Sequence, residues 1–145
     1  MTNNNEQPKH FINESLKESI NDYINQWQTA FSLDSANSII AMYHKEAVLL
    51  GTFSDRVRGS HSAIADYFNQ FFSYQKREVH FLTINYQEIE NMVICSGNYT
   101  FNWQDNTVRK TAEARYTMVF QQVNRGFKII HHHSSLLPKP KVTLD

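Results

Sequence analysis

The stretch VICSGNYTFNW, residues 93–103, decides the fold class, because its large apolar and aromatic side chains recur at every second position. A period of two places alternate side chains on opposite faces of an extended strand. One face of this strand therefore carries Val93, Cys95, Gly97, Tyr99, Phe101 and Trp103. The alternation indicates a sheet that buries one of its faces.

Strand-like segments lie on both sides of this stretch, and each is separated from the next by residues typical of turns. The turns are predicted at Glu90–Asn91, Asp105–Asn106 and Asn124–Arg125–Gly126. The strands are predicted over residues 79–86, 93–103, 112–123 and 127–135. Four consecutive strands joined by short turns form an antiparallel meander.

Three helices are predicted before the meander. Between Ser15 and Phe31 the apolar residues are spaced by three or four, and Ser15 with Glu18 has capping-box spacing. A shorter helix capped by Asp34 is expected to turn three side chains inward, Ile39, Ile40 and Tyr43. After a strand-like run at 47–50, Ser60 or Ser62 caps a third helix with an aromatic side, formed by Ile64, Tyr67, Phe68, Phe71 and Phe72.

This order predicts an α+β fold in which a curved, mainly antiparallel sheet wraps around three N-terminal helices. A sheet curved in this way encloses a cone, and we expect a pocket inside it. Residues 12–138 form the single domain. Residues 1–11 are expected to be a flexible arm and residues 139–145 a tail, because both are polar or proline-containing.

Composition excludes several classes of partner. The 145 residues include 14 Lys+Arg and 14 Asp+Glu, so no net charge favours nucleic acid or an anionic membrane. No stretch has the length and hydropathy of a membrane span or a secretory signal. The single cysteine, Cys95, excludes an intrachain disulfide and a thiolate zinc site, and it is expected to be a buried, inert thiol. We expect a cytoplasmic protein without a cofactor.

Five segments together resemble the nuclear transport factor 2-like superfamily, which has a cystatin-like roll. They are AMYHKEAVLLGTFSDRVRG at 41–59, IADYFNQFF at 64–72, SGNYTF at 96–101, ARYTMVF at 114–120 and IIHHHSSLLP at 129–138. Within this superfamily, the chain is similar to SnoaL-like proteins related to the association (hub) domain of calcium/calmodulin-dependent protein kinase II. The resemblance implies a homodimer formed through the open sheet, and in the hub a ring of such dimers. It implies no kinase activity, since no HRD or DFG element is present.

Arg115 is the first candidate ligand-binding residue. Alternation puts Arg115, Thr117 and Val119 on one face of a strand and Tyr116, Met118 and Phe120 on the other. A guanidinium inside the cone could bind a carboxylate through two hydrogen bonds. The hub has a pocket arginine in the corresponding strand, although Tyr99 and Ser134 stand at the positions of its companion arginines. The alternative is that Arg115 pairs with Glu113 or lies at a dimer surface.

The run His131-His132-His133 is the second candidate. On a strand, His131 and His133 share a face about 7 Å apart, whereas His132 points the other way. Two histidines lack the third ligand that a catalytic metal needs, so no metal site is predicted. The resemblance places His133 or a neighbour near the arginine pocket, and His131 and His133 are therefore candidate ligand contacts. Alternatively, these imidazoles bond to Ser134, Ser135 or neighbouring strands at a dimer interface.

Aromatic residues complete the candidate pocket. Tyr43 and Tyr99 rank first because their hydroxyls need partners if buried, and Trp27 and Phe68 follow as lining residues. The alternative is that all four simply fill the core. Arg56 and Arg58 lie in a polar loop that could stand over a ligand entrance, although solvated loop charge is the simpler interpretation.

The resulting prediction is a homodimerising domain, able to form a higher ring, with a pocket for a small, carboxylate-bearing molecule. One alternative is a SnoaL-like or ketosteroid-isomerase-like enzyme, an isomerase, cyclase or dehydratase of a small carbonyl compound. The resemblance puts Gly51 where the isomerase's base would stand, and Asp66 and Glu113 are the remaining acids considered. A second alternative is a pure oligomerisation module.

Overall fold

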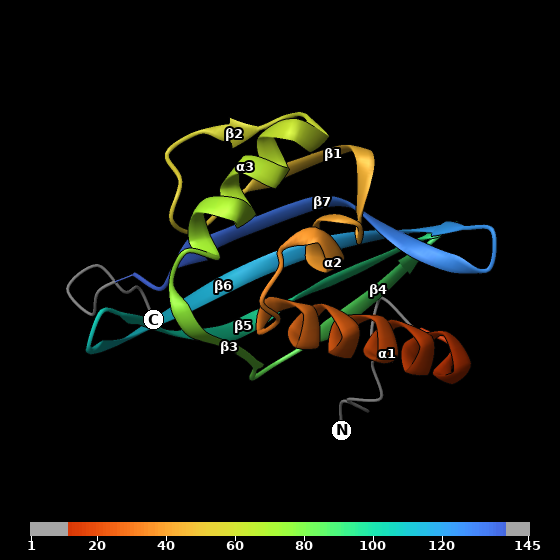
Figure 1. Ribbon diagram of the computed structural model, residues 1–145. Coiled ribbons are helices and arrows are strands. Elements are labelled where there is room, and N and C mark those ends of the chain that lie inside the picture. The colour runs from red at the N-terminus through yellow and green to blue at the C-terminus, as the bar shows by residue number, and fades with distance from the viewer. Residues whose placement is uncertain (1–11, 139–145) are drawn as a thin grey trace, which may run out of the picture.

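A computed structural model describes residues 12–138, so the predicted arm and tail lie outside the described residues. Three helices lie on one side of a seven-stranded sheet (Figure 1). The helices are α1 (Glu14–Phe31), α2 (Asn37–Ile40) and α3 (His61–Phe71). The strands are β1 (Tyr43–Leu50), β2 (Val57–Arg58), β3 (Gln75–Phe81), β4 (Asn85–Ile89), β5 (Met92–Asp105), β6 (Val108–Val123) and β7 (Gly126–Leu136).

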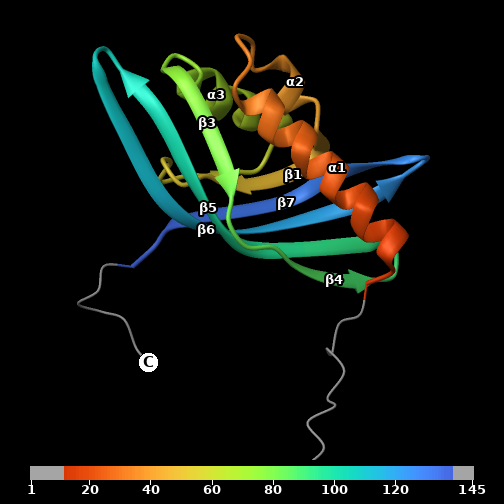
Figure 2. The same cartoon turned by 90° about the horizontal axis from the view of Figure 1, so that it is seen from below.

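The sheet is mainly antiparallel and strongly curved. Its strand order is β2-β1-β7-β6-β5-β3, with β4 also paired to β5, and only β1 and β7 run parallel. Figure 2 shows the long strands β5 and β6 bending around the helices, while no helix of residues 12–138 lies over the opposite face of the sheet. The predicted α+β class, with a curved sheet around three helices, is confirmed.

The helices mostly follow the predicted periodicity. In α1 the buried stripe is Ile20, Ile24, Trp27 and Phe31, all at most 2% exposed. Its cap is Asn13, whose side chain accepts from the Ser15 and Leu16 amides, so the predicted Ser15–Glu18 capping box is wrong. Helix α3 begins after Ser60, whose hydroxyl accepts from Ala63 as expected.

The second helix is shorter than predicted. It spans only Asn37–Ile40 and has no side-chain cap, so Asp34 does not begin it. Tyr43 belongs to β1, where it pairs with Ile129 of β7. The helix ends early because the backbone of Tyr43 forms the parallel pairing with β7 instead of a helical turn. The Tyr43 side chain is still buried beneath the helices, at 2% exposure.

The predicted strand over 79–86 is two strands, β3 and β4, which both pair with β5. The segment that connects β3 to β4 passes over β5 at Gly97. A Cβ added at Gly97 would lie 2.0 Å from the carbonyl oxygen of Thr83 in this segment. The Tyr116 hydroxyl donates to the same carbonyl at 2.8 Å. Glycine at position 97 therefore lets the chain cross between the two strands.

Arg77 joins the C-terminal ends of two helices. Its buried guanidinium donates to the carbonyls of Phe31 and Leu33, at the end of α1, and of Phe72 and Tyr74, just after α3. The guanidinium carbon also lies 3.8 Å from the centroid of the Phe72 ring. One cation thus satisfies carbonyls that both helix ends leave without partners.

A register shift in β7 decides which histidine faces the helices. Phe120 pairs with Ile129 but Val119 pairs with His131, so Ile130 is the extra residue of a β-bulge. After the bulge, His132 and Ser134 are buried on the helix side at 3% and 6% exposure. His131, His133 and Ser135 alternate with them on the open face of the sheet.

Candidate functional site

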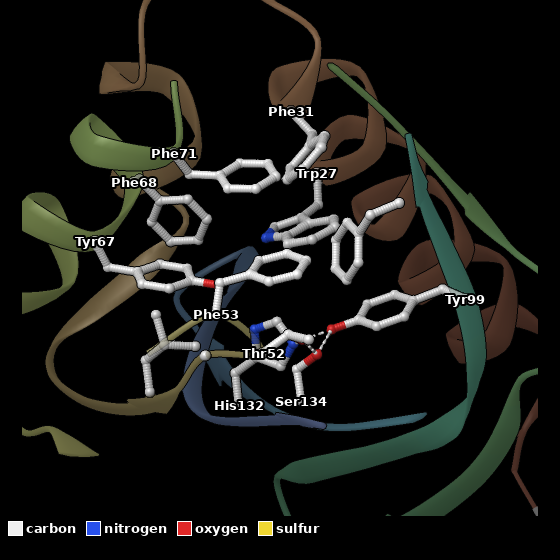
Figure 3. A pocket seen from close by; sticks show the side chains of 13 residues that line it. Trp27, Phe31, Thr52, Phe53, Tyr67, Phe68, Phe71, Tyr99, His132 and Ser134 are labelled. Carbon is white, nitrogen blue, oxygen red and sulfur yellow. Dashed lines mark hydrogen bonds between the residues drawn. The ribbon is translucent and has the colours of Figure 1, made fainter. Parts of the chain in front are cut away.

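A small cavity lies between the helices and the sheet. Its free space is about 10 Å³, room for about one water molecule. Aromatic rings from α1, α3 and β5 surround it, and polar side chains from β7 and the loop after β1 lie at its base (Figure 3). The labelled residues of this lining are Trp27, Phe31, Thr52, Phe53, Tyr67, Phe68, Phe71, Tyr99, His132 and Ser134.

The polar side chains at the base of the cavity form one chain of hydrogen bonds around His132. Nε1 of Trp27 donates to the Tyr43 hydroxyl at 3.2 Å, and that hydroxyl lies 2.8 Å from Nδ1 of His132. Nε2 of His132 lies 3.1 Å from the Tyr99 hydroxyl, which donates to Ser134 at 2.5 Å. Ser134 is also hydrogen-bonded to the Thr52 hydroxyl.

The Trp27 N–H at one end can only donate, and this fixes the direction of every hydrogen bond in the series. An indole N–H can only donate, so the Tyr43 oxygen accepts from Trp27 and its single proton goes to Nδ1 of His132. We therefore assign the proton of the imidazole to Nε2, which donates to Tyr99. Tyr99 then donates to Ser134, and the Ser134 proton is directed to Thr52.

Burial keeps every group of this chain uncharged. It lowers the pKa of His132 to about 3, with smaller contributions in the same direction from His131 and His133. It raises the pKa of Tyr43 and of Tyr99 well above the usual range for tyrosine. The chain therefore presents neutral donors and acceptors, and His132 is a neutral imidazole throughout the physiological pH range.

Arg115 lies on the other face of the sheet, so its predicted place inside the cone is wrong. The face of β6 that carries Tyr116, Met118 and Phe120 faces the helices, and these three are at most 3% exposed. Arg115 is exposed in an open hollow of about 340 Å³ that His133 also lines. The reason is desolvation, since a guanidinium facing the apolar core would lose its water without gaining a carboxylate.

The structure divides the seven predicted site residues into two groups. Trp27, Phe68 and Tyr99 line the interior cavity, and Tyr43 contacts it through His132. Arg115, His131 and His133 lie on the open face of the sheet. The shared face predicted for His131 and His133 is confirmed, but it is not the cavity face.

Sequence reasoning missed His132, Ser134, Thr52 and Phe53 as cavity residues. The alternation in HHHSS already placed His132 and Ser134 on one face, and the apolar side of β6 could have identified that face as the buried one. Thr52 and Phe53 follow a strand in a loop, where no periodicity indicates which side chains turn inward.

The interior cavity does not fit a carboxylate base of the isomerase type. A Cβ at Gly51 would lie 2.4 Å from the Tyr67 ring, so Tyr67 fills the space that an acid at position 51 would need. None of the residues that line the cavity in the described part of the chain is acidic. Asp66, on α3, and Glu113, exposed on β6, are not among them.

The described residues offer neither a cluster of metal ligands nor a membrane-spanning helix. Residues 12–138 contain no group of three or more His, Cys, Asp or Glu side chains that could hold a metal ion. Cys95 is buried, and burial raises the pKa of its thiol to about 12, which makes it unreactive at neutral pH. In the same part of the chain, no helix has the length and hydropathy needed to span a bilayer.

Solved structures with this architecture define the class. A protein from Salmonella enterica of the nuclear transport factor 2 (NTF2-like) superfamily matches with TM-score 0.77 and 17% identity, over 89% of this chain and 96% of that one. A ketosteroid isomerase-like protein from Erwinia carotovora matches with TM-score 0.71 and 15% identity, over 88% and 100%. These likenesses show that the fold is NTF2-like.

The family follows from the sequence comparison. Residues 16–138 match the model of the calcium/calmodulin dependent protein kinase II association domain, and the chain belongs to this family. A Xanthomonas campestris protein whose structure is described by the same family name matches with TM-score 0.78 and 28% identity, over 83% of this chain and 86% of that one. No curated protein matches the sequence.

Proposed function

We propose that this chain is a homodimerising association domain whose interface is the open face of the sheet, with a small-carboxylate site around Arg115 on the same face. The observation that carries the proposal is the composition of that face, where an apolar strip lies beside a polar hollow. Rings of several dimers are a further expectation from the family. A single buried thiol suits a reducing compartment such as the cytoplasm.

The apolar strip crosses four strands. Register places Val48 of β1 beside His131 of β7, His131 beside Val119 of β6, and Val119 beside Ile94 of β5. Leu50 lies two residues along β1 from Val48 and points to the same face. Apart from His131 these side chains are apolar, and no helix of residues 12–138 covers this face. Such a face favours burial against a second surface, and an identical copy supplies one by twofold symmetry.

The hollow beside the strip has the chemistry of an anion site. Arg115 lies opposite Asn98 of β5 and Ser135 of β7, and His133 lies opposite Thr117 of β6. These side chains offer hydrogen bonds around one guanidinium, which binds a carboxylate better than any other group in the set. A dimer partner over the strip would narrow the hollow and shield this interaction from water.

Light scattering of size-exclusion peaks tests the interface. The unmodified chain is expected at twice its monomer mass at micromolar concentration. Val119→Lys places a charge in the centre of the strip and should give a monomer, whereas Val108→Lys should remain dimeric because Val108 is 56% exposed near the end of the β5–β6 hairpin. A monomeric unmodified chain, or equal effects of the two lysines, would contradict the interface.

Titration with succinate, followed by thermal unfolding, tests the carboxylate site. Succinate should raise the unfolding temperature of the unmodified chain but not of Arg115→Gln. Arg125→Gln is the matched control, because Arg125 is exposed in the turn between β6 and β7. If both variants respond like the unmodified chain, Arg115 is not the carboxylate ligand and the domain remains a pure oligomerisation module.

A further inference from the structure

Three aromatic residues separate the interior cavity from a second hollow outside it. Phe53, Tyr67 and Phe71 line both spaces, and the outer hollow has a volume of about 150 Å³. A volume of this order holds a benzene-sized ring. The wall between the two spaces is therefore made of side chains, and the space for a larger site depends on whether one of them can move.

Arg58 supplies the outer hollow with a buried cation. It is only 9% exposed, and its guanidinium carbon lies 6.0 Å from the centroid of the Tyr67 ring. Nε of Arg58 donates to the Ser54 hydroxyl at 3.3 Å. Within residues 12–138, neither of its terminal nitrogens is hydrogen-bonded and no carboxylate forms an ion pair with it.

These terminal nitrogens face open space. Among the described residues, every fully buried side-chain nitrogen or oxygen has a hydrogen-bond partner. The unbonded nitrogens of Arg58 are therefore in contact with solvent, and the solvent space beside Arg58 is the outer hollow. A guanidinium with its planar edge free and its other side packed on protein is arranged to bind a carboxylate through two hydrogen bonds.

Phe53 is the most exposed residue of the wall. Its ring stacks on Phe71, with centroids 5.3 Å apart and planes 4° apart, and it makes a T-shaped contact with Trp103, with centroids 5.1 Å apart. Yet Phe53 is 41% exposed, and it lies in the loop between β1 and β2, outside the sheet pairing. Because aromatic contacts position this ring, another flat ring could replace it against Phe71 and Trp103.

We propose that Phe53 is a replaceable plug, and that its withdrawal joins the two spaces into one binding site for an aromatic carboxylate. The carboxylate would bind Arg58, and the ring would stack on Phe71 in the place of Phe53. A hydroxyl on the far side of the ring would reach Thr52, the end of the hydrogen-bonded chain from Trp27. This site is separate from the proposed Arg115 hollow, which lies on the other face of the sheet.

Calorimetric titration with 4-hydroxybenzoate tests the plug. Phe53→Ala should bind this probe at least tenfold more tightly than the unmodified chain, because no ring has to be displaced. The double variant Phe53→Ala/Arg58→Gln should bind the probe at least tenfold more weakly than Phe53→Ala alone. Arg56→Gln in the same Phe53→Ala background should leave the affinity unchanged, because Arg56 is an exposed arginine of the same loop. Phe53→Leu provides a second, milder opening if the alanine variant does not fold.

Two further comparisons define the ligand and the location. The neutral analogue 4-hydroxybenzamide should bind the Phe53→Ala variant at least tenfold more weakly than 4-hydroxybenzoate. Arg115→Gln in that background should leave 4-hydroxybenzoate binding unchanged, so failure of the Arg115 site and failure of the plug are distinguishable. Equal affinity of the Phe53→Ala variant and the unmodified chain, equal binding of the amide, or insensitivity to Arg58→Gln would overturn the proposal.

Discussion

The Tyr43 hydroxyl and Nδ1 of His132 lie 2.8 Å apart beneath the helices, and this contact joins the start of β1 to the last strand of the sheet. Both residues are nearly excluded from water, at 2% and 3% exposure. Each therefore depends on the other for a partner that water cannot supply. The base of the cone is a polar network with a set orientation inside an otherwise apolar core.

Removing the Tyr43 hydroxyl should destabilise the fold. Tyr43→Phe leaves the Trp27 N–H and Nδ1 of His132 without partners, and each unsatisfied buried group costs about 1–3 kcal/mol. Denaturant unfolding should show a loss of about 2–4 kcal/mol. Tyr74→Phe is the control, because the Tyr74 hydroxyl makes no hydrogen bond to any described residue, and it should change stability by less than about 0.5 kcal/mol. Similar losses in the two variants would contradict the network.

His132 should make the fold less stable in mild acid. Its folded pKa of about 3 lies below the ordinary value of 6.5, so the unfolded chain binds the proton more readily between these values. Stability is therefore complete above pH 6.5 and falls as the pH drops towards 3. Between pH 7 and pH 5 the contribution of His132 should be a loss of about 2 kcal/mol.

Urea titrations at the two pH values measure this loss. His132→Gln should remove it, whatever its effect on stability at pH 7, because glutamine does not titrate. Val108→Gln is the control, since it is an exposed change that removes no group titrating between pH 5 and pH 7 and should leave the pH dependence unchanged. A pH dependence that persists in His132→Gln would show that other groups cause it.

Arg77 should be a main support of the helix layer. Arg77→Met removes the donor for four backbone carbonyls at the ends of α1 and α3 and should cost about 2–4 kcal/mol of the free energy of unfolding. Arg125→Met, at an exposed turn position, should cost less than about 0.5 kcal/mol. Thermal and urea unfolding give both values, and an Arg77 variant as stable as the Arg125 variant would refute this role.

Two glycines should respond differently to a methyl group. Gly97→Ala would place a carbon against the Thr83 carbonyl, which belongs to the backbone and cannot turn away, and should cost about 2 kcal/mol or more. Gly59→Ala meets nothing within 4 Å and should leave stability unchanged or slightly raised. Parallel unfolding curves of the two variants test the crossing of the β3–β4 connection over β5.

Much of the fold could be predicted from the sequence because its strands bury only one face. The alternation over residues 93–103 and 114–120 assigns side chains to faces correctly, and the turns after Ile89, Asp105 and Val123 fall where the sequence predicts them. Alternation alone does not say which face meets the helices. Arg115 was placed inside by resemblance, although Tyr116, Met118 and Phe120 form the more apolar face of that strand.

The remaining parts of the site depend on contacts between distant segments. The bulge at Ile130, which sets His132 beneath the helices, arises from the pairing of β7 with β6 and leaves no local pattern. Phe53 packs on Phe71, Phe101 and Trp103, which are brought together only when α3 packs on the curved sheet. Tertiary packing, not local sequence, therefore determines the composition of the cavity.

Intermolecular nuclear Overhauser effects in a mixed sample of isotope-labelled and unlabelled protein test the dimer interface most directly. We expect contacts between the two copies at the methyl groups of Val48, Leu50, Ile94 and Val119. Methyl groups exposed elsewhere, those of Leu33 after α1 and of Val108 near the end of the β5–β6 hairpin, should show none. Intermolecular contacts confined to Leu33 or Val108, or none at the open face of the sheet, would contradict this interface.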